Sequence, residues 1–189
     1  MTTRRTNPLA LRLAPLYLSS FLGAFALWVP IEKLFLVSIG FTAASVGIMA
    51  AVYAVVVPIL ELPSGVLADR WSRRGVLVLA TVAAIAAVVI GGLSQDVTAY
   101  VISAVFLGVF FALQSGTLES VVYDTVLEET GDSESFERTI GRLRLVESVG
   151  LVTSALAGGL IAEFAALRLT YFATAPLRAY RWEVCTPRC

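Results

Sequence analysis

Histidine is absent from this chain of 189 residues, and both cysteines, Cys185 and Cys189, lie in its last five positions. Without histidine there is no imidazole for general acid–base catalysis, for a hydrolase triad of the usual kind or for most catalytic zinc sites. Two cysteines so close to one end indicate neither a disulfide framework nor a zinc site. The sequence also has no H-E-x-x-H or G-x-S-x-G motif, so it predicts no enzyme, no metal and no other cofactor.

Charged side chains are scarce as well: they make up 15% of the residues, against 58% for hydrophobic ones. The fourteen basic and fourteen acidic residues cancel to a formal net charge of zero, so nucleic acid is not an expected partner. A water-soluble domain cannot bury so large an apolar share of its side chains. The sequence therefore indicates a membrane protein.

Five apolar runs are long enough to cross a bilayer, whose hydrocarbon is about 30 Å thick and takes about 20 helical residues. Four of them have no charge and the fifth has one: 13–31, 41–60, 75–95, 97–118, and 145–162 with Glu147. None of them alternates as a strand does, and a chain inside a bilayer must satisfy its own backbone hydrogen bonds. Each run is therefore predicted to be a helix.

A sixth apolar segment begins at Leu169 and reaches only Leu177 before Arg178, which is too short to cross. The predicted fold class is all-α: a polytopic transmembrane bundle of five complete spans and a partial sixth. The last twelve residues, 178–189, change abruptly in composition. This change favours a truncated or frame-shifted gene product over a true short tail that follows an interfacial helix.

The arginines predict the orientation, because cytoplasmic loops carry the excess of basic residues. If the N-terminus is cytoplasmic, nine arginines lie on that side: Arg4, Arg5, Arg12, Arg70, Arg73, Arg74, Arg138, Arg142 and Arg144. The outer loops then hold only Arg168. We expect a multi-pass protein of the plasma (inner) membrane with a cytoplasmic N-terminus at residues 1–12.

The bundle is predicted to occupy residues 13–177, with a cytoplasmic loop at 128–142 and an atypical tail at 178–189. After Ser133, Phe136, Ile140 and Leu143 recur at helical spacing and lead into the fifth span. This spacing fits a short amphipathic helix on the membrane surface, and it fits equally well a solvated loop that carries three apolar residues.

The stretch from Gly65 to Arg74 joins the second and third predicted spans and is expected to be a cytoplasmic loop. Gly65, at a helix end, lets another backbone approach closely, and Asp69 can accept hydrogen bonds from loop donors or face a helix N-terminus. Arginines in this position anchor the cytoplasmic side, although many cytoplasmic loops carry them.

This stretch resembles the signature of the major facilitator superfamily, G-x-x-x-D-[RK]-x-G-[RK]-[RK], at the loop where that family has it. The matching residues are Gly65, Asp69, Arg70, Arg73 and Arg74. Ser72 stands where the family usually has glycine, and the arginine common in the fourth span of the family is absent, with Gln114 in that region. Drug/proton antiport is therefore not specifically indicated.

The resemblance covers about residues 8–176 and implies the N-terminal six-helix half of such a transporter. It implies that Asp69 and the arginines of the motif form a charge relay. In the family this relay bears on a helix of the second half and helps to set the outward-facing state.

Ionisable groups inside a membrane are costly and are therefore candidates for function. Glu32 and Lys33 lie near the outer end of the first span, where Trp28 and Glu32 share one helical face with three other aromatic residues. Such a face suits a substrate cavity. The alternative, of equal weight, is that Glu32 and Lys33 lie at the membrane interface and extend to water.

Three further carboxylates are candidate substrate or coupling groups, each with a structural alternative. Glu61 lies one turn before Gly65 on a face of small residues, where pairing with a cytoplasmic arginine is favoured over carrying a proton. Glu119 could serve as a gate, as an anchor for a loop or in coupling. For Glu147, a pair with Arg144 or Arg142 is the simpler interpretation.

The leading functional hypothesis is a secondary active transporter of a small solute, with protons as a candidate coupling ion and the site between helical repeats. One half provides only one wall of such a site, so a second copy or a complementary half is expected as a partner besides the lipid bilayer. The alternative is a membrane protein that does not transport, either a degenerate fragment or an interaction module of another transporter.

Overall fold

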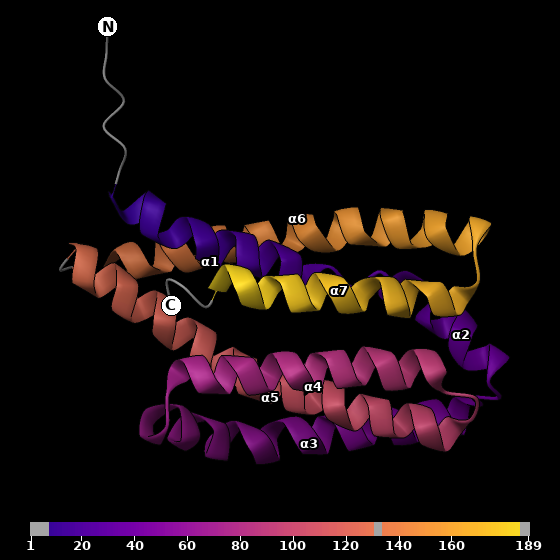
Figure 1. The fold of residues 1–189 in the computed structure, drawn as a ribbon. Coiled ribbons are helices and arrows are strands. Elements are labelled where there is room, and N and C mark those ends of the chain that lie inside the picture. The colour runs from indigo at the N-terminus through magenta and orange to yellow at the C-terminus, as the bar shows by residue number, and fades with distance from the viewer. Residues whose placement is uncertain (1–7, 131–133, 186–189) are drawn as a thin grey trace, which may run out of the picture.

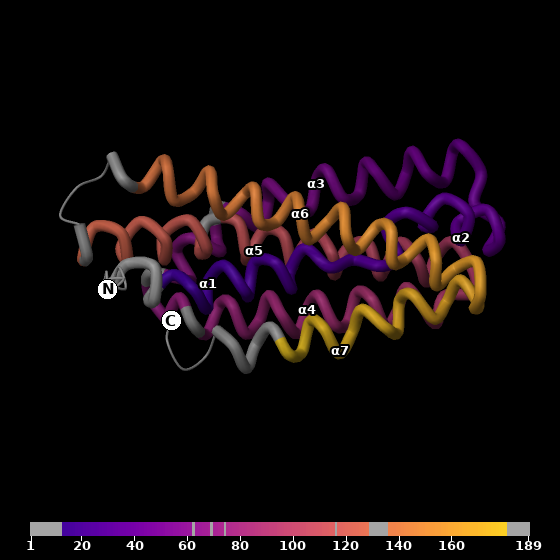
Figure 2. The backbone as a smooth tube through the Cα atoms, turned by 90° about the horizontal axis from the view of Figure 1, so that it is seen from above, coloured from indigo at the N-terminus to yellow at the C-terminus, as the bar shows by residue number. Residues whose placement is uncertain are grey.

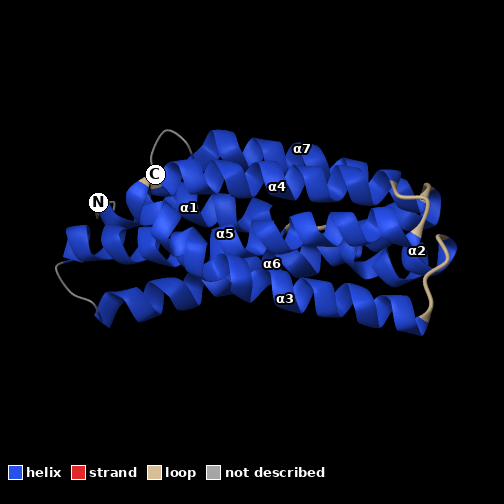
Figure 3. Cartoon of the chain, turned by 90° about the horizontal axis from the view of Figure 1, so that it is seen from below, coloured by secondary structure: helices blue, strands red, loops and turns tan. Residues whose placement is uncertain are grey.

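The chain is almost entirely helical in the computed structural model, which describes the backbone of residues 8–130 and 134–185. The side chains of 8–12, 62, 69, 74, 116, 129, 130, 134, 135 and 181–185 are outside this description. In chain order the elements are α1 (Pro8–Ala24), the 3₁₀ turn η1 (Val29–Ile31), α2 (Glu32–Ser38), α3 (Ala43–Arg70), α4 (Arg73–Leu93), α5 (Val97–Thr130), α6 (Glu134–Phe164) and α7 (Leu167–Cys185) (Figure 1). No strand occurs among the described residues (Figure 3).

The long helices lie side by side in an up-and-down bundle (Figure 2). Helices α3, α4 and α5 pack as one group and α1, α6 and α7 as another, and the contacts of α4 with α7 and of α5 with α6 join the two groups. In the described part of the chain, five helical segments are long and apolar enough to cross a membrane, and α7 is not among them. The prediction of an all-helical bundle with five complete spans is confirmed.

Short side chains at the turns explain where the helices begin. The Thr42 hydroxyl accepts from the backbone N–H of Ser45, and the Ser45 hydroxyl accepts in return from the N–H of Thr42, which closes a capping box at the start of α3. The Ser72 Oγ accepts from the N–H of Gly75 at 2.9 Å and caps α4 in the same way. Gly40, with φ of +89°, makes the left-handed turn before α3.

The first predicted span, 13–31, is not one continuous helix. Helix α1 ends at Ala24, and the chain continues through η1 into the short helix α2. Pro30 has no N–H to donate to the carbonyl of Ala26, which accepts instead from the N–H of Val29 at 3.1 Å. The single helical face that the sequence predicted for Trp28, Glu32 and three other aromatic residues is therefore interrupted.

Helix α6 holds this interruption in place with small residues. The Ser154 hydroxyl accepts a hydrogen bond of 2.9 Å from the backbone N–H of Ala26, which the broken helix leaves without a helical partner. Gly158 lies so close to Leu27 that an added Cβ would overlap the Leu27 carbonyl, and a Cβ on Gly150 would lie 2.8 Å from the Phe21 oxygen. The small-residue face of the fifth span is thus a packing surface for the end of α1.

Two segments expected as loops are helical. Helix α3 runs to Arg70 and α4 begins at Arg73, so Gly65 to Arg74 is a helix end, a two-residue turn and a helix start. In the expected loop 128–142, α5 continues to Thr130 and α6 begins at Glu134 and runs on as the fifth span. Phe136, Ile140 and Leu143 lie on this helix and pack against the end of α5 and the start of α1, so the helical interpretation of their spacing is confirmed and the solvated loop is wrong.

The sixth helix also extends further than expected. Helix α7 does not end at Leu177, because it continues through Pro176 and Arg178 to Cys185. Arg178, the first residue of the tail predicted from composition, is 5% exposed and lies inside the bundle. Residues 186–189 of that tail lie outside the described part.

Candidate functional site

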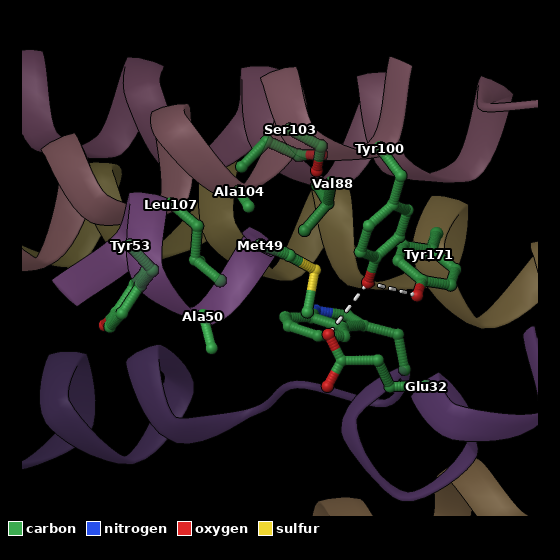
Figure 4. A pocket seen from close by; sticks show the side chains of 12 residues that line it. Glu32, Met49, Ala50, Tyr53, Val88, Tyr100, Ser103, Ala104, Leu107 and Tyr171 are labelled. Carbon is green, nitrogen blue, oxygen red and sulfur yellow. Dashed lines mark hydrogen bonds between the residues drawn. The ribbon is translucent and has the colours of Figure 1, made fainter. Parts of the chain in front are cut away.

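A cavity of about 290 Å³ lies between the two helix groups, at the end of the bundle where α5 and α7 begin. We call it the tyrosine cavity. Its walls come from the α1–η1 turn and from α2, α3, α4, α5 and α7: Trp28, Glu32, Met49, Ala50, Tyr53, Ala87, Val88, Tyr100, Ser103, Ala104, Leu107 and Tyr171 (Figure 4). Among the described residues of this lining, Glu32 is the only ionisable acid or base other than the three tyrosines. The lining is therefore apolar and aromatic around one carboxylate.

A chain of hydrogen bonds holds Glu32 (Figure 4). The Tyr100 hydroxyl donates to Glu32 Oε1 at 2.9 Å, and the hydroxyls of Tyr100 and Tyr171 lie 2.9 Å apart. A phenol has a single proton, so Tyr100, which donates it to Glu32, accepts from Tyr171. This network links α2, α5 and α7 at one carboxylate.

Aromatic packing joins the α1–η1 turn, α2 and α7 at the same place. The ring of Trp28 stacks on that of Tyr171, with centroids 5.4 Å apart and an angle of 19° between the planes. Tyr171 also meets Phe35, at 5.0 Å. Trp28 and Glu32, predicted to line one cavity, both line this one, whereas Lys33 is exposed and is not part of its wall.

A second cavity, of about 260 Å³, lies on the other side of Trp28 and Leu107, which border both cavities. We call it the arginine cavity. Helices α1, α5, α6 and α7 and the α1–η1 turn line it: Ser20, Gly23, Ala24, Ala26, Trp28, Val29, Leu107, Phe110, Phe111, Gln114, Ser115, Leu118, Arg144, Glu147, Leu151 and Arg178.

Arg144 connects two of the candidate carboxylates at this cavity. One of its nitrogens lies 3.1 Å from Glu147 Oε2, and another lies 2.8 Å from Glu119 Oε1 on α5. The pair of Glu147 with Arg144, the simpler interpretation of that carboxylate, is confirmed. Glu61, expected to meet an arginine, accepts instead from the Ser115 hydroxyl at 3.1 Å. These contacts tie α3, α5 and α6 together.

The residues of the Gly65–Arg74 motif lie around the turn between α3 and α4. Arg73 forms an ion pair with Asp124 on α5, and its Nη1 also donates to the carbonyl of Ser120 at 3.4 Å. Arg70 is exposed, and the side chains of Asp69 and Arg74 lie outside the described residues. No described atom lies within 4 Å of a Cβ added to Gly65, so the close approach expected there is not made by the part of the chain that the structure describes.

The Arg73–Asp124 pair predicts a measurable coupling between α4 and α5. Both side chains are about half-exposed, so we expect a coupling energy of about 0.5–1 kcal/mol, the range of exposed ion pairs. Arg73→Asp and Asp124→Arg should each lower the stability, and the double variant should recover part of the loss. A double-mutant cycle of unfolding in mixed detergent micelles measures this coupling. A cycle that closes at zero would show that the pair adds nothing.

Several residues of the two cavities gave no usable signal in the sequence. Tyr100 and Tyr171 are ordinary aromatic residues within apolar runs, and Arg178 was assigned to the tail. The same holds outside the cavities for Asp124, the partner of Arg73, which lies in a stretch that the sequence placed beyond the fourth span. Which of these side chains meet depends on how the helices are rotated in the bundle, and one sequence does not contain that information.

A family model matches residues 13–178, and its description is Major Facilitator Superfamily. A search of curated proteins found no match. The matched range contains all five membrane-spanning segments, the Gly65–Arg74 motif and the residues that line both cavities. Members of the family are transporters and not enzymes. Because the match covers most of the chain, this multi-pass membrane protein belongs to the Major Facilitator Superfamily.

Proposed function

We propose that this chain forms one half of a secondary transporter that moves a small solute together with a proton, and that Glu32 carries the proton. The observation behind this proposal is the position of Glu32: among the described residues it is the one carboxylate in an otherwise apolar cavity between membrane-spanning helices. Acidic residues in such positions form the proton relays of pumps and transporters.

The surroundings of Glu32 suit a group that gains and loses a proton. The Tyr100 hydroxyl can donate to the ionised carboxylate, as it does here at 2.9 Å, and it can accept from the protonated acid after its own O–H has turned away. Glu32 also lies just past the break of the first span. Broken membrane helices commonly line the ion and substrate sites of secondary transporters.

Helix α3 supports the view that this chain is one half of the working unit. None of residues 43–61 is buried, although this segment is one of the five spans. Glu61 is among its exposed residues, and an exposed carboxylate in a span faces protein or a wet cavity more favourably than lipid. A second copy of the chain, or a complementary half, is proposed to face α3 across the transport route.

We also propose a plasma-membrane location with the N-terminus in the cytoplasm. Arg73, Arg138, Arg142 and Arg144 all lie at the end of the bundle where α4 and α6 begin. Arg168 lies at the opposite end, where α7 begins. The excess of arginine marks the first end as cytoplasmic.

Proteoliposomes that contain an entrapped pH dye test the coupling. The purified chain is challenged with a series of amino acids, sugars, amines and carboxylates, and radiolabelled uptake is followed in parallel. We expect at least one solute to enter and to acidify the lumen, since the proton travels with it. Glu32→Gln should abolish acidification because an amide cannot carry the proton. Glu163→Gln, a matched change at an exposed carboxylate outside both cavities, should leave acidification intact.

Two results would contradict this function. Uptake without proton movement, or full coupling in Glu32→Gln, would remove Glu32 from the mechanism. Absence of uptake for every solute by correctly inserted protein, also after mixing with a complementary half, would favour the membrane protein that does not transport.

A further inference from the structure

The tyrosine cavity restricts the kind of solute that it can accept. Its volume of about 290 Å³ is near the lower end of ordinary ligand pockets, which measure about 300–1,000 Å³. Most of its wall is apolar or aromatic (Figure 4). Such a wall suits a small molecule with an apolar body and few polar atoms. It disfavours a sugar, because many hydroxyls would be left without partners.

The indole of Trp28 brings an unused hydrogen-bond donor to this wall. Trp28 is 7% exposed, and its Nε1–H has no partner among the described residues. The ring stacks on Tyr171, which belongs to the hydrogen-bond network of Glu32, so the indole lies at the Glu32 end of the cavity. A buried polar group without a partner is costly and indicates a missing one. An indole N–H only donates, so the missing partner must offer an acceptor.

Glu32 becomes a second donor when it carries a proton. Its Oε1 accepts from Tyr100 at 2.9 Å, whereas its Oε2 has no hydrogen bond to a described residue. A proton on Oε2 leaves the bond from Tyr100 in place and gives the cavity an acid O–H. The proton-loaded cavity therefore offers the N–H of Trp28 and the O–H of Glu32 to an acceptor such as a carbonyl oxygen.

The same proton removes the formal charge of the wall. Glu32 is the one carboxylate among the described residues of the lining, and no described cation belongs to that lining. Lys33 is exposed, and Arg168 lies over the ring of Phe35. Arg168 also donates to the carbonyl of Gly92 at 3.0 Å. A charged solute would thus lose its water in the proton-loaded cavity without gaining a counter-charge in the wall, a cost that a neutral solute does not have.

We infer that the tyrosine cavity binds a small neutral molecule with an apolar or aromatic body and a carbonyl oxygen, which accepts from Trp28 and from protonated Glu32. The inference rests on the proposed function, because the cavity is neutral only while Glu32 carries the proton. It names the class of solute that travels with that proton. Binding is measured separately from transport.

Fluorine NMR of the full chain in lipid nanodiscs tests the inference. The probes share a fluorophenyl ring: 4-fluoroacetophenone is a neutral ketone, 4-fluorobenzoate an anion, 4-fluorobenzylamine a cation, and 4-fluoroethylbenzene a neutral hydrocarbon without an acceptor. Binding is the saturable change in the fluorine signal that empty nanodiscs do not give. The probes are ranked on Glu32→Gln, whose neutral amide keeps an N–H donor in place of the acid O–H. We expect the ketone to bind at least fivefold more tightly than each other probe, and at least as tightly as it binds the wild type.

Substitutions in the Glu32→Gln background separate hydrogen bonding from packing. Trp28→Phe should lower the ratio of ketone affinity to hydrocarbon affinity about fivefold, because only the ketone loses a hydrogen bond. Glu32→Leu, which is neutral but cannot donate, should lower this ratio likewise and serves if Trp28→Phe does not fold. Trp71→Phe, the same change at an exposed position outside both cavities, should have no effect. Ser20→Ala should have none either, since Ser20 lines the arginine cavity, which Trp28 also borders.

Tightest binding of the cation or the anion by Glu32→Gln, equal binding of ketone and hydrocarbon, or an unchanged ratio in both Trp28→Phe and Glu32→Leu would overturn the inference. Loss of ketone binding in Ser20→Ala would place the ligand in the arginine cavity and overturn it as well. Proton-coupled uptake of a charged solute, without ketone binding, would overturn it and leave the proposed function standing. Ketone binding without transport of any solute would do the reverse.

Discussion

Gly158→Ala is expected to lower the free energy of unfolding by about 2 kcal/mol, although alanine is the better helix former. An added Cβ would overlap the Leu27 carbonyl oxygen and lie 2.9 Å from its carbon and 3.1 Å from Leu27 Cα. All three are backbone atoms, so no side chain can turn aside, and α6 must move from the break in the first span. The clash costs about 3 kcal/mol, and the gain in helix propensity returns about 1 kcal/mol.

The adjacent glycine provides the control. No described atom lies within 4 Å of a Cβ on Gly159, so Gly159→Ala should leave stability unchanged or raise it by up to about 1 kcal/mol. Unfolding in mixed detergent micelles, followed by circular dichroism, measures both variants. If the two alanines behave alike, the contact of Gly158 with Leu27 does not hold the broken helix.

The five spans could be predicted from the sequence because the bilayer leaves few options. A run of about 20 apolar residues must close its own backbone hydrogen bonds, and only a helix does this within one segment. The starts of α4 and α5, at Arg73 and Val97, lie within two residues of the predicted starts at 75 and 97. Capping by Ser72 agrees with the first of these boundaries.

The break after Ala24 could not be predicted in the same way, because proline alone does not decide it. Pro58 and Pro63 lie within the continuous helix α3, and Pro176 lies within α7. At Pro30 the helix is interrupted, and there α6 supplies the Ser154 hydroxyl for the freed N–H of Ala26. Residues 128 positions apart make this contact, so no local pattern contains it.

Contacts between distant residues also limit how much of the site could be predicted. Trp28 and Glu32 were found because they share one helical face at the end of the first apolar run, where an acid next to the membrane is a candidate for function. Their partners Tyr100 and Tyr171 lie in other helices, and only the packing of α5 and α7 brings them together. Arg178 was missed because composition placed it in a tail, whereas α7 continues through it into the bundle.

Tyr100→Ala is expected to have the largest effect on stability, a loss of about 3 kcal/mol. Tyr100 is 3% exposed, and its ring meets Phe35, Phe41 and Tyr171 at centroid distances of 5.9, 5.6 and 6.3 Å. Lipid chains solvate apolar groups about as well as protein does, so the loss arises from packing and from the cavity left behind rather than from transfer to water.

Tyr100→Phe measures the contribution of the hydroxyl to stability separately from that of the ring. It removes the hydrogen bonds to Glu32 and Tyr171 and keeps the ring contacts, so it should cost about 1 kcal/mol, the scale of hydrogen bonds between membrane helices. Tyr180→Ala, at an exposed position of α7, should change stability by less than about 0.5 kcal/mol. Micelle unfolding measures all three variants. If Tyr100→Ala costs no more than Tyr100→Phe, the aromatic cluster does not hold α2, α5 and α7 together, and Glu32 depends on the hydroxyl alone for its position.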